Sequence, residues 1–151
     1  MQRWTSEPIP LPAFAEAPWE RADLEFESLE HDGPSYAVAV FLNNPDVPED
    51  AGDDAPGFAG RFTVFAHGDC WGDAGHCEPP TRPVSAFDRR PLHPLTPINI
   101  TVEVTDALRA LGDVDEVTVT ALAYSTQPEK REEVLRFARL TLVTYDPPAT
   151  V

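Results

Sequence analysis

Apolar residues along this chain recur with the period of half-buried β-strands. Successive side chains of a strand point to opposite faces, so alternating apolar and polar residues indicate one face turned to a core. Tyr36–Leu42 differs, since its nearly continuous apolar run is typical of a central strand. Together with runs rich in β-branched residues, this pattern predicts strands over Asp23–Glu30, Tyr36–Leu42, Phe58–His67, Ile98–Val104, Glu116–Tyr124 and Val134–Tyr145.

The sequence predicts one short helix, over Ala107–Leu111, with Thr105 and Asp106 as its N-terminal cap and Gly112 as its stop. Strands without intervening helices favour an antiparallel arrangement. We therefore predict an all-β fold, an antiparallel β-sandwich with Greek-key or jelly-roll-like connections, six to seven strands, one short helix and a long loop that contains Cys and His.

The chain has the length of one domain, with 151 residues. We expect a proline-rich extended arm over residues 1–22, the sandwich over 23–146 and a short tail over 147–151. The arm carries apolar residues, among them Trp4 and Trp19. They are expected either to dock on a partner or to close an open sheet edge of the domain itself.

Charge excludes two classes of ligand. The formal net charge is −15, from 26 acidic and 11 basic residues, and phosphate binding requires a basic surface. We expect no binding to nucleic acid and none to anionic membranes. The sequence contains no apolar run of the roughly 18 residues that a membrane span needs and no signal-peptide pattern, which predicts a cytoplasmic protein.

Candidate chemistry is concentrated after the third predicted strand. His67, Cys70, His76 and Cys77 lie within eleven residues that also contain three glycines. Thiolate and imidazole ligands together suit copper(I) or zinc(II), although the Cys-x6-Cys spacing differs from that of zinc knuckles. Three interpretations stay open: a metal site, a disulfide between Cys70 and Cys77, and packed loop residues without either. His93 is a further candidate ligand.

Several strand motifs, taken in order, resemble a known domain. The segments are Tyr36–Asn43, Gly57–Phe65, Ile100–Leu108 with Leu111 and Gly112, and Val117–Thr120. Over roughly residues 23–145 they resemble the C-terminal domain of tyrosinase and polyphenol-oxidase-type proteins. The resemblance implies a β-sandwich that in those proteins covers the entrance to a type 3 copper site and can keep the enzyme latent. The copper domain itself, with its six histidines, is absent from this sequence, so the resemblance implies no oxidase activity.

These observations favour a non-catalytic accessory module that binds a protein partner, such as a type 3 copper protein, and that holds copper or zinc through His67, Cys70, His76 and Cys77. We identify no catalytic residues for this function. One alternative is a small metalloenzyme in which the same loop leaves a metal position open and Asp69 or Asp73 acts as base. The other is a homo-oligomeric structural module without metal, which assembles through its sheet edges and arm.

Overall fold

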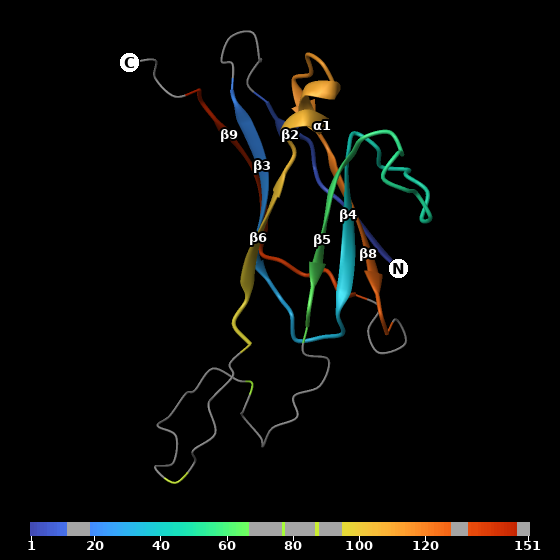
Figure 1. The fold of residues 1–151 in the computed structure, drawn as a ribbon, viewed down its shortest axis with the longest axis vertical. Helices are drawn as coiled ribbons and strands as arrows, with labels where there is room; N and C mark the ends of the chain where they lie inside the picture. The colour runs from blue at the N-terminus through green and yellow to red at the C-terminus, as the bar shows by residue number, and fades with distance from the viewer. Residues whose placement is uncertain (12–18, 67–76, 78–86, 88–94, 128–132, 148–151) are drawn as a thin grey trace.

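The computed structural model describes residues 1–11, 19–66, 77, 87, 95–127 and 133–147. This part of the chain contains nine strands and one helix (Figure 1). In chain order they are β1 (Gln2–Thr5), β2 (Ile9–Pro10), β3 (Arg21–Leu29), β4 (Tyr36–Leu42), β5 (Phe58–Val64), β6 (Ile98–Glu103), α1 (Thr105–Ala110), β7 (Glu116–Val117), β8 (Val119–Ser125) and β9 (Arg139–Tyr145).

Two antiparallel sheets form the layers of a sandwich. The larger has the strand order β1-β8-β4-β5, and the smaller has the order β6-β3-β9. A two-stranded ribbon, β2 with β7, lies beside α1 at one end of the molecule (Figure 1). The all-β sandwich predicted from the sequence is therefore confirmed.

The core lies between the two sheets. Leu24 and Phe26 of β3 face Val38 and Val40 of β4, and all four side chains are fully buried. An aromatic cluster extends this core, because Phe26 packs edge-on against Phe137 with ring centroids 5.2 Å apart. The two-residue period of β3 therefore turns its apolar residues to the core, whereas the continuous apolar run of β4 is buried on both faces.

The predicted strands are present, but most of their bounds differ from those in the structure. β4 has the predicted bounds, and the inward face of β5 carries Val64. The predicted strand over Val134–Tyr145 begins only at Arg139, because the backbone of Val134 and Leu135 is bonded by the side chain of Gln2 and not by a neighbouring strand. The predicted strand over Glu116–Tyr124 is divided into β7 and β8 at Thr118, whose backbone N–H donates to the Asn43 side chain at 2.8 Å.

The helix begins earlier than predicted and has a different cap. Val104 is the N-cap residue, and no side chain caps the first turn. Thr105 lies in the helix, and its buried hydroxyl accepts a hydrogen bond from the Ala22 N–H at 3.1 Å. Thr105 therefore joins the helix to β3 instead of capping it. No helix in the described part of the chain is long and apolar enough to cross a membrane.

The beginning of the proline-rich arm belongs to the sandwich. β1 pairs antiparallel with β8 and forms one edge of the larger sheet. Trp4 packs edge-on against Phe137, with ring centroids 4.9 Å apart. Two roles were expected for the arm. Residues 2–5 have the second one, because they pair with an edge of the domain's own sheet. Residues 12–18 of the arm lie outside the described residues.

The acidic loop between β4 and β5 covers the outer face of the larger sheet. Phe41 and Leu122 point to that face and form a second small apolar cluster with Val47 of the loop. The guanidinium of Arg3 donates to the backbone carbonyls of Pro45 and Val47, and the Tyr124 hydroxyl donates to the carbonyl of Glu49 at 2.7 Å. The loop has no regular secondary structure, and its backbone is bonded by side chains of β1 and β8.

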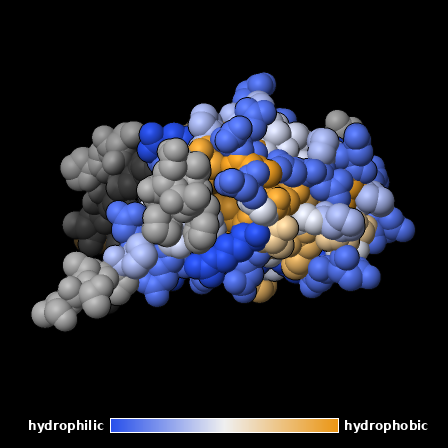
Figure 2. Space-filling model, turned by 90° about the horizontal axis from the view of Figure 1, so that it is seen from above, coloured by the Kyte–Doolittle hydropathy of each residue, from blue (hydrophilic) through white to orange (hydrophobic). Residues whose placement is uncertain are grey.

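Apolar surface is visible at the end of the molecule that carries α1. Seen from this end, orange side chains lie among hydrophilic ones (Figure 2). The half-buried side chains of Ile9 in β2, Ala107 in α1 and Leu111 after it pack against the core. These contacts close this end of the sandwich.

Candidate functional site

The predicted metal-binding segment lies almost wholly outside the described residues. His67, Cys70, His76 and His93 are among the residues that the structure leaves undescribed. Cys77 is described, and it is disulfide-bonded. Its carbonyl accepts a hydrogen bond from the Leu95 N–H at 2.9 Å. The metal site therefore stays a prediction. The bonding of Cys77 is the one expected if the cysteines form a disulfide.

Among the described residues, no three side chains of His, Cys, Asp or Glu lie close enough together to hold a metal ion. The polar groups that do gather there lie on the outer face of the smaller sheet. The period of β3 turns Ala22, Leu24 and Phe26 to the core and therefore turns Arg21 and Asp23 outward. This outer face is the candidate site.

Asp23 is the centre of the site. Cross-strand register places it between Glu103 of β6 and Val143 of β9. Although it lies on the outer face, Asp23 is only 2% exposed. Its two carboxylate oxygens accept hydrogen bonds from Nε of Arg21 at 2.8 and 3.0 Å. This bond to Asp23 raises the pKa of Arg21. The buried carboxylate is therefore compensated by a guanidinium on its own strand.

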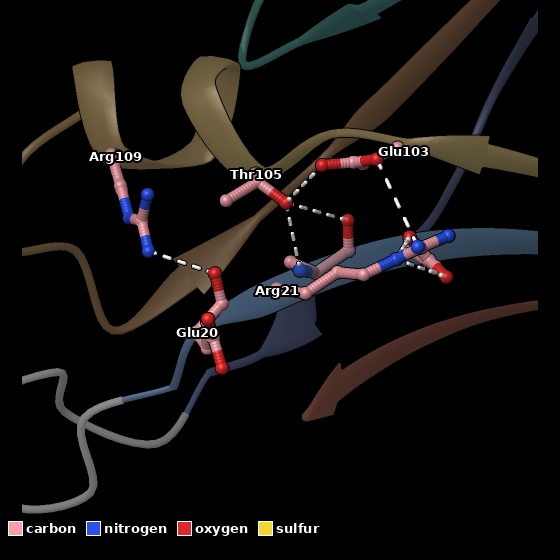
Figure 3. A network of polar contacts seen from close by, with 7 residues as sticks. Glu20, Arg21, Glu103, Thr105 and Arg109 are labelled. Carbon is pink, nitrogen blue, oxygen red and sulfur yellow. Dashed lines mark hydrogen bonds and ion pairs between the residues drawn. The ribbon is translucent and has the colours of Figure 1, made fainter. Parts of the chain in front are cut away.

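Glu103 connects this pair to the helix (Figure 3). One of its carboxylate oxygens accepts a hydrogen bond from the Thr105 hydroxyl at 3.1 Å, and the other lies 4.0 Å from Nη1 of Arg21. Nearby, Arg109 of α1 donates to the Glu20 carbonyl at 2.8 Å and lies over the Trp19 ring, 5.3 Å from its centroid. The start of β3 is thus fixed to α1 by polar contacts.

Tyr145 borders the site on β9. The Arg21 guanidinium lies over its ring, 5.9 Å from the centroid. Desolvation raises the pKa of Tyr145, and the neighbouring carboxylates, first of all Asp23, raise it further. With Glu20, Arg21, Asp23 and Glu103, Tyr145 lines an open depression of about 620 Å³. The depression carries three carboxylates and one guanidinium, so it can accept a basic or polar group from a partner.

Local sequence patterns do not reveal this site. Acidic residues alternate with apolar ones along β3, but Asp23 meets Glu103 and Tyr145 only through the pairing of β3 with β6 and β9. The local signal was the charge pair Arg21-x-Asp23, whose members share one face of a strand. The order of the strands brings Glu103 and Tyr145 to this site, and no local sequence pattern encodes that order.

A second ion pair joins β3 to β9 and makes stability depend on pH. Glu27 accepts hydrogen bonds from Arg139 at 2.9 and 2.6 Å, and these bonds hold the pKa of Glu27 below its usual value of 4.5. A carboxyl with a lowered folded-state pKa stabilises the fold above its unfolded pKa, and this stabilisation is lost as pH falls through the folded pKa. We expect Glu27→Gln to reduce the loss of unfolding free energy below about pH 4.5, measured by urea denaturation. An identical pH profile in variant and parent would contradict the assignment.

Comparison with known proteins gives a likeness of fold. No family model matches the sequence, and no curated protein matches it. Among solved structures, the chain is similar to latent aurone synthase, a polyphenol oxidase, from natural source, with 13% identity and a TM-score of 0.54 over 97% of this chain. The recombinantly expressed latent aurone synthase gives the same identity and TM-score. This chain covers 24% and 25% of the length of those two chains. At this identity the likeness shows the fold alone.

Proposed function

We propose that this chain is a non-catalytic accessory module that binds a protein partner, and that the partner is a type 3 copper protein. The observation that carries the proposal is the likeness of fold between 97% of this chain and about a quarter of a polyphenol oxidase described as latent. The strand motifs that resemble the C-terminal domain of that family fall on β4, β5, β6, α1, β7 and β8.

The candidate site supplies a contact surface for this partner. The depression on the smaller sheet is bordered by Glu20 and Glu103, and the whole chain carries a net charge of −15. Charge complementarity steers association and selects partners. We therefore infer that a basic surface of the partner meets this face.

The experiment mixes the purified chain with the isolated copper domain of a polyphenol oxidase from the same organism. Calorimetry should give a saturable one-to-one complex, and diphenol oxidation should fall as the chain is added. Glu20→Lys with Glu103→Lys should weaken binding, whereas the matched pair Asp46→Lys with Asp54→Lys, on exposed positions of the loop between β4 and β5, should not. No complex at about 100 μM of each protein would refute the proposal.

Metal binding by the His67–Cys77 segment remains part of this proposal for the reduced chain only. A thiolate, and not a disulfide sulfur, is the metal ligand, and Cys77 is disulfide-bonded here. We expect elemental analysis to find no stoichiometric copper or zinc in the oxidised chain. One equivalent in the reduced chain, lost in Cys70→Ser/Cys77→Ser, is the expected positive result. A reduced chain that binds none would reject the metal site.

A further inference from the structure

β9 forms an open edge of the smaller sheet. It pairs with β3 over seven consecutive residues, from Arg139 to Tyr145, without a register shift. No other strand of the described chain pairs with its opposite side. The edge of a sheet presents a row of backbone N–H and C=O groups that can pair with a further strand.

The other sheet edges are short, interrupted by a register shift or acidic at one end, whereas β9 is long and regular, and its only charged residue is Arg139 at its first position. β1 has only four residues, and a register shift interrupts the pairing of β5 at Gly60. β6 has a register shift at its start and ends on the charged Glu103. β9 has the sequence RLTLVTY, without Pro, Gly, Lys or an acidic residue. Long, regular and weakly charged edges are the ones that pair.

We propose that β9 pairs antiparallel with β9 of a second copy of this chain, about a twofold axis at Leu142. The inference does not rest on the proposed accessory function, although Tyr145 borders both surfaces. In this register Arg139 lies opposite Tyr145 of the second copy, Thr141 opposite Val143 and Leu140 opposite Thr144. Two three-stranded sheets then become one of six strands, and the interface is self-complementary, as twofold symmetry requires.

The side chains of β9 suit this register. On the outer face, the side chain of Arg139 is 68% exposed although it pairs with Glu27, and Tyr145 is 42% exposed although Arg21 lies over its ring, so both keep surface for a contact across the axis. A guanidinium and an aromatic ring attract each other, as Arg21 and Tyr145 already do within one chain. Thr141 and Val143 form β-branched pairs, and at the axis Leu142 meets Leu142. No like charges face each other.

Charge decides between a second copy and an unrelated strand. Two chains of net charge −15 repel each other, so they associate best where carboxylates are absent. The residues of β9 offer such a place, with one arginine and no acid. We therefore take the strand that pairs with β9 to be β9 of a second copy, since it brings no acidic side chain to this edge. Because salt screens the overall repulsion, dimerisation is expected to strengthen as salt is added.

The test measures oligomeric state by sedimentation equilibrium between about 1 and 500 μM, at about 0.1 and 0.5 M sodium chloride. The parent should dimerise, more strongly at high salt. Thr141→Lys/Val143→Lys sets lysines opposite each other across the axis and should raise the dimer dissociation constant about tenfold or more. The matched pair Thr63→Lys/Thr101→Lys, on exposed positions of β5 and β6, should not. A monomeric parent, or equal weakening by the control pair, overturns the proposal.

Cysteine cross-linking tests the register without depending on the folding of the lysine variant. In Thr141→Cys/Val143→Cys each new thiol lies opposite one of the second copy, so oxidation should give a covalent dimer on a non-reducing gel. Thr141→Cys alone faces a valine and should not cross-link. Equal cross-linking in both variants, or none in either, contradicts this register.

Discussion

Replacing Gly57 with alanine is expected to destabilise the protein by about 4 kcal/mol. Gly57 has a φ of +78°, a conformation that costs an L-residue about 1–2 kcal/mol. Its carbonyl also accepts a hydrogen bond from the Leu42 N–H at 2.7 Å, at the end of β4. A Cβ at this position would overlap the Leu42 carbonyl oxygen, so the backbone must separate and this bond must break. Urea denaturation at neutral pH measures the effect.

Gly112→Ala is the matched control for this substitution. Gly112 has nearly the same φ, +75°, but nothing lies within 4 Å of an added Cβ. In Gly112→Ala the free energy of unfolding should fall only by the cost of a positive φ in an L-residue, about 1–2 kcal/mol. Equal losses in the two variants would show that backbone conformation alone, and not the close approach to Leu42, makes glycine necessary at position 57.

The inner strands β3 and β4 could be predicted because the hydropathy of their own residues shows which of their faces are buried. β4 is covered on both faces, by the core on one side and by the Val47 cluster on the other, which explains its continuous apolar run. β3 alternates because one of its faces meets the core and the other carries charges. In both strands the hydropathy pattern of a few neighbouring residues indicates which faces of the strand are buried.

Elements that depend on distant partners could not be predicted in the same way. The predicted last strand is too long because Val134–Arg136 has no strand partner, although its apolar residues suggested one. The break at Thr118 arises from Asn43, 75 residues away in sequence. Pairing of β1 with β8 likewise joins residues more than a hundred positions apart. No local periodicity contains this information.

The candidate site also depends on contacts between residues that are distant in the sequence. Cys and His stand out in a sequence because their chemistry is distinctive at any position in a chain. Asp23 does not stand out among the many carboxylates of this sequence, and only its 2% exposure marks it as unusual. Burial of a charged group on the outer face of a sheet results from Arg21, Glu103 and Tyr145 together, and those residues belong to three different strands.

Gln2 connects β1 to the segment that precedes β9, and loss of its side-chain hydrogen bonds is expected to lower the free energy of unfolding by about 3 kcal/mol. Its side-chain oxygen accepts hydrogen bonds from the N–H groups of Val134 and Leu135, both at 2.8 Å, and its amide donates to the Leu135 carbonyl at 3.2 Å. Val134 and Leu135 are buried side chains in a segment without strand partners. Gln2 thus supplies the hydrogen bonds that a neighbouring strand would otherwise give.

Two substitutions separate the contributions of the Gln2 amide. Gln2→Met keeps the length of the side chain and removes all three bonds, which leaves partly buried backbone groups without partners. Gln2→Glu keeps the acceptor for the two N–H groups and replaces only the donor, so its loss should be about half as large. Urea denaturation compares both variants with the parent, and hydrogen exchange at the Val134 and Leu135 amides should accelerate in Gln2→Met only. Unchanged protection of those amides in Gln2→Met would show that the segment is held by packing, with Val134 and Leu135 themselves fixing the strand that follows.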